Sequence, residues 1–443
     1  MSTTAEFHVA IVGGGPGGIC LGLALQHRNI PFTIYESRAE FSEIGAGIVM
    51  AAHAVRALQL CEPSLAEKFH ALVGNNDAAP ASLSVRNELR YGVSRHRHED
   101  SEVIHQVVRS RTGARTVHRN ELMTMLAKDS EAGCAQFNKR LTSYEHKDGR
   151  VELKFADGTA ASANLLVAMD GIHSSVRTCM FGAQSPLSKP IYSECLAYRA
   201  VISMDRYIEA FGVPVTHSTI RLGPKKFLIN YPVSGGTQVN CVAFMDKCGS
   251  GEEWPHTEWI IPSQREQLRR DFQGFGPGVQ KILDAMELTD PSVWALHQHS
   301  AQPDSFVDNL VILMGDAAHS MLPHLGAGAS QAIEDAYVLA ETLASPTLRW
   351  GPVSAEPLHE ALTATEQARK PRFSEVQRLS KDNGRRFLDF VDEKLERQAL
   401  QEWLDEYERR FDWLWDYDVA VDAVKARELL EQSLQKTEDV NKS

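Results

Sequence analysis

The sequence predicts an α/β fold: a Rossmann-like nucleotide-binding domain with an inserted mixed β-sheet domain and C-terminal helices. Three observations lead to this prediction. A glycine-rich turn joins an apolar strand to a helix near the N-terminus, alternating apolar and polar residues fill the middle of the chain, and no glycine occurs after Gly384. We expect the nucleotide-binding domain over 1–190 and 301–350, the inserted sheet over 191–300, and the helical region over 351–443.

The composition is typical of a globular protein and disfavours several partners. Of the 443 residues, 43% are hydrophobic and 23% are charged, which is a normal balance for a chain with a sizeable core. The formal net charge of −12 disfavours nucleic acid and anionic membrane surfaces, because both attract basic patches. The seven cysteines are scattered without a CxxC pair, so we expect reduced thiols and no metal site.

The N-terminal segment predicts neither export nor membrane insertion. Residues 1–8 are polar and lack the features of a secretory signal, and the apolar run Val9–Leu25 is interrupted by glycines and a proline. We therefore expect a cytoplasmic protein without a membrane span.

A glycine-rich turn between a strand and a helix predicts a dinucleotide-binding site. The strand Phe7–Val12 runs into Gly13, Gly15 and Gly18, which form a GxGxxG motif. The first glycine permits the tight turn, the second lets the backbone approach a pyrophosphate, and the third lets the helix pack on the strand. Glu36 follows at the end of the next strand, where a carboxylate can accept ribose hydroxyls. The motif fits FAD and NAD alike.

Two later strand ends carry candidate cofactor contacts. The apolar strand Asn164–Ala168 ends near Asp170, and the strand Leu310–Met314 runs into Asp316. Ligands bind at the carboxyl ends of the strands in open α/β sheets, so both carboxylates are candidates. Gly326 precedes a predicted helix, whose N-terminus a glycine would allow to approach a polar ring. Each segment taken alone is also compatible with an ordinary turn.

The middle and the end of the chain predict different layers. Strand patterns over Leu196–Met204, Phe227–Val233 and Val239–Phe244 indicate an antiparallel sheet with one face over a pocket. Beyond Pro357 the chain reads as almost wholly helical. Three tryptophans there are expected to pack between helices or in an interface, which would allow a homodimer. They are Trp403, Trp413 and Trp415.

Together, these motifs resemble the class A flavoprotein monooxygenases of para-hydroxybenzoate hydroxylase type, over roughly residues 7–345. That family carries GxGxxG, then a DG motif, then a GD motif with a downstream P-x-x-G-x-G, and all three occur here in that order. The resemblance implies FAD as cofactor, with NAD(P)H and dioxygen as co-substrates. Arg119, within Thr116–Leu122, looks like the family's arginine that reaches the FAD.

Two further segments resemble the salicylate hydroxylase branch of this family. They are Glu43–Ile48, which contains Gly47, and Pro323–Ala329, which ends in Ala329. Gly47 and Ala329 are accordingly expected at the cofactor. The DG motif departs from the family, since Ala168 stands where a glycine is usual, and the nicotinamide site stays unassigned.

The surroundings of Arg199 and Tyr231 are similar to those in fungal dearomatising hydroxylases of polyketide pathways. In those enzymes an arginine and a tyrosine at matching positions hold the substrate phenolate, which implies catalytic roles for Arg199 and Tyr231. A guanidinium stays charged and offers a planar fork to an oxyanion. From the pattern alone, the simpler interpretation is that Arg199 pairs with a surface carboxylate and that Tyr231 is a half-buried sheet residue.

The resemblance thus implies hydroxylation of a phenolic, polyketide-type substrate, such as a resorcinol-like aldehyde or ketone, with oxidative dearomatisation through a C4a-hydroperoxyflavin. The alternatives are a salicylate-type, decarboxylative hydroxylase and a flavin dehydrogenase or reductase. We expect His319 to support its loop, whereas His324 either tunes the flavin or meets the substrate. His53 stands where many members have Pro-Asn, and we interpret it as a neutral replacement rather than a pocket residue.

Overall fold

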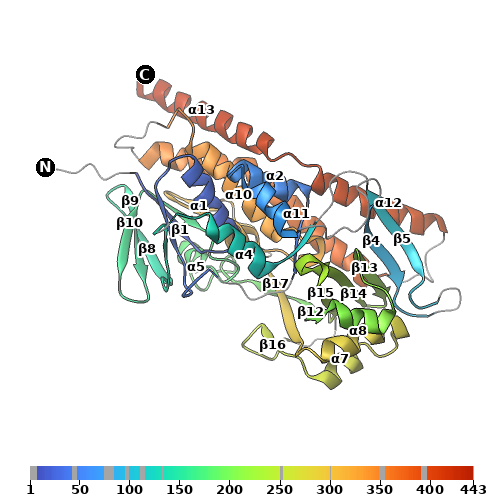
Figure 1. The fold of residues 1–443 in the computed structure, drawn as a ribbon. Coiled ribbons are helices and arrows are strands. Elements are labelled where there is room, and N and C mark those ends of the chain that lie inside the picture. Colours follow the sequence, from blue (N-terminus) through green and yellow to red (C-terminus); the bar gives the residue numbers. More distant parts are fainter. Residues whose placement is uncertain are drawn as a thin grey trace.

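The predicted α/β architecture is confirmed by the computed structural model (Figure 1). It describes residues 7–41, 47–73, 84–94, 99–109, 115–131, 133–249, 253–299, 301–348, 355–390 and 397–442. Two large sheets form separate layers, and long helices from the C-terminal part of the chain lie along both of them.

The nucleotide-binding layer is a six-stranded sheet with the order β18-β19-β11-β1-β2-β7. Its strands are β1 (Val9–Val12), β2 (Phe32–Tyr35), β7 (Ala135–Gln136), β11 (Leu165–Ala168), β18 (Val307–Asp308) and β19 (Val311–Leu313). All neighbours are parallel except the edge pair β18–β19. The central strands β1 and β11 are buried along their whole length, which explains their unbroken apolar sequences.

Two smaller sheets flank this layer. The predicted hairpins form the antiparallel sheet β10-β9-β8, built from β8 (Leu141–Lys147), β9 (Arg150–Phe155) and β10 (Ala160–Ala163). A short antiparallel pair joins β3 (Gly47–Met50) to β6 (Arg115–His118). This pair leads directly into a helix that starts at Arg119.

The second layer is an eight-stranded mixed sheet with the order β16-β17-β12-β15-β14-β13-β4-β5. Its strands are β4 (Ser84–Tyr91), β5 (Val103–Arg109), β12 (Ile191–Ser203), β13 (Ser218–Gly223), β14 (Lys226–Val233), β15 (Gln238–Asp246), β16 (Ile260–Pro262) and β17 (Ser292–Gln298). Only the pair β13–β4 is parallel; the other neighbours are antiparallel. Strands β4 and β5 come from the range 1–190 that the sequence assigns to the nucleotide-binding domain, so the chain enters this sheet earlier than expected.

Helices cover both layers. They are α1 (Pro16–His27), α2 (Ala52–Cys61), α3 (Leu65–Val73), α4 (Arg119–Lys128), α5 (Ser175–Phe181), α6 (Met204–Phe211), α7 (Arg265–Asp271), α8 (Pro277–Glu287), α9 (Asp316–His319), α10 (Gly328–Leu343), α11 (Ala355–Leu388), α12 (Arg397–Trp415) and α13 (Ala420–Lys442), with short 3₁₀ turns at Ser234–Gly236 and Pro323–Leu325. One face of the eight-stranded sheet packs on α6, α7 and α8, and the other faces α11 and α12.

The helical C-terminal region is confirmed and bridges the two layers. Helix α11 packs on α10 and α13, whereas its C-terminal end shares a core with α12 and the eight-stranded sheet. In Figure 1 the red helix α13 runs across the end of the molecule that holds α1 and α10. None of the helices within the described ranges is long and apolar enough to cross a membrane. The expected homodimer and the cytoplasmic location stay predictions.

Candidate cofactor and substrate site

A cavity of about 790 Å³ lies where the two layers meet, a volume that suits a small-molecule site. Its lining comes from the glycine-rich turn, the segments around β3 and β6, the loop after β11, the inner face of the eight-stranded sheet, and the loop from β19 to α10. The C-terminal helices close one side of it. Among these lining residues are Gly15, Gly47, Arg119, Arg199, Tyr231 and Asp316.

The glycine-rich turn packs so closely against backbone atoms that it has no space for side chains at Gly13 and Gly18. Gly13 has a φ of +106°, and a Cβ atom there would stand 2.3 Å from the Met169 carbonyl oxygen. A Cβ atom on Gly18 would stand 2.0 Å from the Gly13 carbonyl oxygen. Gly15 caps α1, so the free N–H groups at this helix end face the cavity and suit a diphosphate.

Glu36 lies directly behind this turn at the end of β2. Its carboxylate accepts hydrogen bonds from the Gly14 amide at 2.7 Å and from the Arg38 amide at 2.8 Å. Arg38 itself lines the cavity. The bonds hold the carboxylate beside the turn, but Glu36 is not among the described residues that line the cavity, and its ribose contact stays a prediction.

Asp170 lies in the loop after β11, and one of its two carboxylate oxygens is hydrogen-bonded to the start of α5. Its Oδ2 atom accepts hydrogen bonds from the amides of Ser175 and Val176, at 2.7 and 3.2 Å, and so holds the start of α5. Burial raises the pKa of this carboxyl. Its neighbours Met169 and Gly171 line the cavity. Asp170 therefore shapes the site through α5, and its direct cofactor contact stays a prediction.

The GD motif brings a carboxylate to the cavity. Strand β19 leads through Gly315, with a φ of +54°, into α9, whose first residue is the exposed Asp316. Gly326, with a φ of +63°, and Ala329 line the cavity where α10 begins. Arg119 faces Asp316: burial lowers the pKa of the guanidinium, and the Asp316 charge opposes that shift. Three separated motifs thus meet at one cavity, as the sequence predicts.

The geometry fits a flavin dinucleotide on this side. Backbone without side chains, a helix N-terminus, one buried arginine and one carboxylate line the same space. Of the segment 43–48, Gly47 and Ile48 line the cavity, whereas residues 43–46 lie outside the described residues. Within the described ranges, no cluster of three or more histidine, cysteine or acidic side chains is suited to a metal ion.

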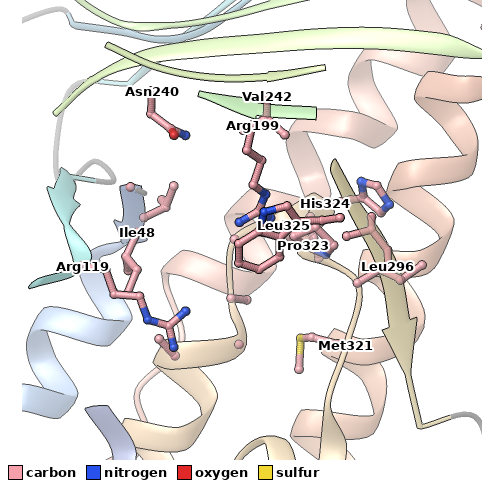
Figure 2. Close-up of a pocket in the computed structure, with 18 of the residues that line it drawn as sticks. Ile48, Arg119, Arg199, Asn240, Val242, Leu296, Met321, Pro323, His324 and Leu325 are labelled. Carbon is pink, nitrogen blue, oxygen red and sulfur yellow. The ribbon is translucent and has the colours of Figure 1, made fainter. Parts of the chain in front are cut away.

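The inner face of the eight-stranded sheet supplies the other half of the lining (Figure 2). Side chains alternate along a strand, so Arg199 on β12 points to the cavity while its neighbour Tyr198 packs into the core on the other face. Tyr231 on β14 and Asn240 on β15 share the inner face, and strand pairing places them opposite each other.

Arg199 is a cation that meets no counter-charge among the residues that the structure describes. Its guanidinium lies over the Trp294 ring, 4.3 Å from the ring centre. Within the described ranges no carboxylate pairs with it, and its Nε atom has no hydrogen-bond partner. Burial lowers the pKa of Arg199, and Tyr231 acts in the opposite direction. The alternative of a surface ion pair for Arg199 is therefore wrong, and the side chain is available to an anionic ligand.

Tyr231 is a buried donor beside Arg199. Its hydroxyl donates to the Gly47 carbonyl oxygen at 3.2 Å, and its ring would touch a Cβ atom on Gly47. Burial raises the pKa of Tyr231 to about 12, with the Arg199 charge acting against the shift. The phenol therefore keeps its proton at neutral pH. Tyr231 links the substrate side to β3 on the cofactor side.

His324 lines the cavity, whereas His319 and His53 do not. The His324 ring packs on Phe227 and Phe244, and burial lowers its pKa to about 3, so the imidazole is neutral. His319 is buried and hydrogen-bonded to an aspartate, in agreement with a supporting role. His53 is buried against Glu334 rather than in the pocket, so it is more than a neutral replacement.

Sequence reasoning missed the wall that the C-terminal helices provide. Phe387 on α11 and the aromatic side chains Tyr407, Phe411 and Trp415 on α12 line the cavity. Trp415 packs on Phe411 in the core shared by α12 and the large sheet, as expected, and in addition it forms part of the cavity wall, which the sequence did not predict. The aromatic spacing of four residues along α12 was the available signal, because such residues share one helix face.

Comparison with known proteins agrees with this geometry. The family described as FAD binding domain matches residues 6–356. Over 425 residues the chain is 34% identical to the 6-methylsalicylate 1-monooxygenase atA of Aspergillus terreus, covering 95% of this chain and 91% of that protein. A salicylate hydroxylase of Pseudomonas putida is 32% identical over 431 residues, covering 95% and 94%. A solved salicylate hydroxylase substrate complex has a TM-score of 0.81 at 27% identity, covering 96% of this chain and 98% of the other.

Proposed function

The chain belongs to this FAD-binding family and is a class A aromatic monooxygenase, and from that premise we propose that it hydroxylates a phenol bearing a carbonyl group next to its hydroxyl. FAD is its cofactor and NAD(P)H its reducing co-substrate. Bound FAD would supply the activated oxygen, so the chain's own residues have to orient the phenol, raise its reactivity and exclude water.

The observation that carries this proposal is the unpaired guanidinium of Arg199 in the cavity wall. A phenolate is a much stronger carbon nucleophile than a phenol, and a fixed cation beside the phenolic oxygen favours the phenolate. Charge-assisted contacts of this kind strengthen as water leaves the site. Tyr231 keeps its proton, and on substrate binding its single O–H would turn from the Gly47 carbonyl oxygen to the phenolic oxygen or to the neighbouring carbonyl.

The remaining lining favours a neutral, apolar-substituted ring over a polyanion. Around Arg199 the walls are largely apolar, and the nearby imidazole of His324 is uncharged. The apolar lining includes Val242, Phe244, Leu296, Met321 and Leu325. We therefore infer a resorcinol-like aldehyde or ketone of polyketide type as the substrate, with attack at a substituted ring carbon and loss of aromaticity.

A second candidate is decarboxylative hydroxylation of a salicylate. It is favoured by the 34% identity to a 6-methylsalicylate 1-monooxygenase and by the structural likeness to a salicylate hydroxylase substrate complex. A salicylate would place one carboxylate on Arg199 and would lose that group as carbon dioxide. The two candidates therefore differ in product and not in cofactor.

One experiment separates them. Purified holoenzyme is supplied with NADPH or NADH, isotopically labelled dioxygen, and either 6-methylsalicylate or a resorcinol-type aldehyde, and products are read by mass spectrometry. We expect the aldehyde to gain one labelled oxygen atom and to keep its carbonyl substituent. Release of carbon dioxide from the salicylate with no turnover of the aldehyde would replace the first candidate by the second. Oxidation of NAD(P)H without any oxygenated product would overturn both and favour a reductase.

A further inference from the structure

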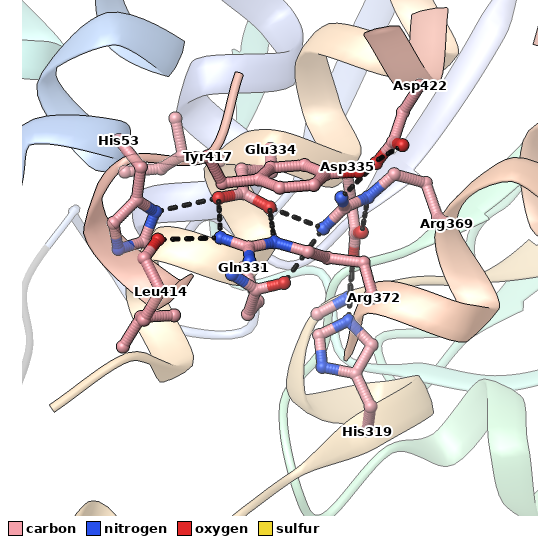
Figure 3. Close-up of polar contacts among 12 residues, drawn as sticks. His53, His319, Gln331, Glu334, Asp335, Arg369, Arg372, Leu414, Tyr417 and Asp422 are labelled. Atoms are coloured by element: carbon pink, nitrogen blue, oxygen red, sulfur yellow. Dashed lines mark hydrogen bonds and ion pairs between the residues drawn. The ribbon is translucent and has the colours of Figure 1, made fainter. Parts of the chain in front are cut away.

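A buried network of charged side chains joins the C-terminal helices to the loop after β19 (Figure 3). Three carboxylates and two guanidinium groups form it, and none of the five residues is more than 4% exposed. They are Glu334 and Asp335 on α10, Asp422 on α13, and Arg369 and Arg372 on α11. Buried charges are retained only when they are paired with good geometry, so the arrangement needs every partner.

Asp335 connects this network to the GD motif. Its Oδ2 atom accepts hydrogen bonds from the Gly315 amide at 3.0 Å and from Nε2 of His319 at 2.6 Å. Gly315 and His319 flank Asp316, the carboxylate that α9 presents to the cavity. One buried carboxylate oxygen thus ties both ends of the turn that carries Asp316.

Arg369 fixes the other oxygen of Asp335. Its Nε atom donates to Oδ1 of Asp335 at 2.9 Å, and Nη1 donates to Asp422 at 2.7 Å. Its Nη2 atom reaches Gln331 at 3.0 Å and Glu334 at 2.9 Å. Arg369 lies beyond residue 356, where the match to the FAD-binding family ends. The orientation of Asp335 therefore depends on a helix outside that match.

We propose that Asp335 is a positioning residue of the FAD site and that Arg369 makes the C-terminal helices part of that site. Asp335 holds the backbone from Gly315 to His319, so that Asp316 faces the ribityl and diphosphate region of FAD. The inference rests on the proposed placement of FAD in the cavity. It assigns the C-terminal helices a role in holding the cofactor that is additional to their aromatic wall.

The test compares two isosteric variants, Asp335→Asn and Asp422→Asn. Each removes one carboxylate charge from Arg369, but only Asp335 contacts Gly315 and His319. The dissociation constant for FAD is measured by fluorescence titration of apoprotein, and the unfolding midpoint of the same apoprotein is measured separately. We expect Asp335→Asn to raise the dissociation constant about tenfold or more and Asp422→Asn to change it less than about twofold.

If the network only stabilised the fold, the two variants would not differ in their affinity for FAD. Two outcomes would overturn the positioning role. In the first, both variants lower the unfolding midpoint but leave the dissociation constant for FAD unchanged. In the second, both variants raise this dissociation constant equally. Where Asp335→Asn gives no folded protein, Arg369→Lys takes its place, because an ammonium group cannot hold the fork that orients Asp335. Its control is Arg378→Lys, on the exposed face of the same helix, where Arg378 pairs with Glu375.

For the fallback pair, Arg369→Lys is expected to raise the dissociation constant at least about threefold and Arg378→Lys to leave it unchanged. Equal affinities in these two variants would sink the inference. Failure of the wild-type apoprotein to bind FAD would instead overturn the proposed function. The two failures are therefore distinguishable by the wild-type titration alone.

Discussion

The two halves of the cavity are built by different means. On the cofactor side, backbone atoms line the space, and glycines at Gly13, Gly18 and Gly315 allow close approach. On the substrate side, side chains such as Arg199 and Tyr231 project from an antiparallel sheet. At these glycines the first half therefore tolerates no added Cβ atom, whereas the second half can exchange side chains while its backbone stays in place.

This difference predicts which property each substitution changes. The cofactor half decides whether FAD is retained, and the substrate half decides whether bound FAD is used productively. The comparison is supported if substitutions in the cofactor half change FAD retention and substitutions in the substrate half change only turnover. A substitution in the substrate half that releases FAD would contradict it.

The largest effect is expected for Gly18→Val on the cofactor side. A Cβ atom at this position would overlap the Gly13 carbonyl oxygen, so α1 has to move away from the turn. We expect a loss of at least about 3 kcal/mol, or roughly 100-fold, in FAD affinity. The ratio of flavin to protein absorbance in the purified protein measures it.

The matched control is Gly149→Asn in the β8–β9 hairpin, where an added Cβ atom meets nothing within 4 Å and asparagine tolerates the left-handed φ of +72°. This variant should remain yellow. A flavin content in Gly18→Val equal to that of the control would show that the turn does not hold the cofactor.

Arg199→Ala tests the substrate side. Loss of a preorganised cation costs about 100- to 1000-fold in kcat/KM for the phenolic substrate, because the phenolate is no longer favoured. FAD affinity should stay within about twofold of wild type, since Arg199 lies on the sheet half of the cavity. Steady-state kinetics and the FAD titration are measured on one preparation, and Arg199→Lys should restore part of the activity. Unchanged turnover in Arg199→Ala would remove it from the mechanism.

Tyr231→Phe sharpens the comparison, because Tyr231 touches both halves through the Gly47 carbonyl oxygen. We expect kcat/KM to fall about fivefold, which corresponds to the loss of one hydrogen bond worth roughly 1 kcal/mol. The pKa of Tyr231 is raised to about 12, so the hydroxyl stays protonated in the wild type at any ordinary assay pH. The ratio of kcat/KM of the wild type to that of Tyr231→Phe should therefore be constant from pH 7 to about pH 10. A ratio that falls toward 1 at pH 9 would contradict this assignment.

His324→Gln gives the smallest expected effect, on stability against acid. The pKa of His324 falls from an ordinary value of about 6.5 to about 3 in the folded protein, so the unfolded chain takes up its proton first. The contribution of the neutral imidazole to stability is present above pH 6.5 and is lost as pH falls toward 3. Between pH 7 and pH 5, the wild-type apoprotein should lose on the order of 1 kcal/mol more unfolding free energy than the variant. Equal losses in denaturant titrations would show that His324 is exposed to protonation in the folded state.

Local patterns were sufficient for much of the fold. The helix over 328–343 and the turn around Gly13–Gly18 are recognisable because a helix start and a tight turn depend on residues close in sequence. The motifs that follow β1, β11 and β19 could also be expected to lie together, because parallel strands present their carboxyl ends at one edge of a sheet.

Long-range pairing was not accessible in the same way. The strands β4 and β5 join the eight-stranded sheet through a parallel contact with β13, more than 100 residues away in sequence. No local pattern specifies such a partner, because strand residues show only which of their faces is apolar.

The sequence by itself determined the dinucleotide-binding turn and the positions where glycine is needed, because these depend on short motifs with a local physical reason, and the order of its motifs carried the resemblance that implied the family and FAD. Only the tertiary structure decided that Arg199 has no counter-charge within the described part of the chain, that one oxygen of Asp170 is bonded to α5, and that α12 completes the wall. Charge pairing and burial are properties of residues that meet across the fold, and their sequence separation carries no information about the partner.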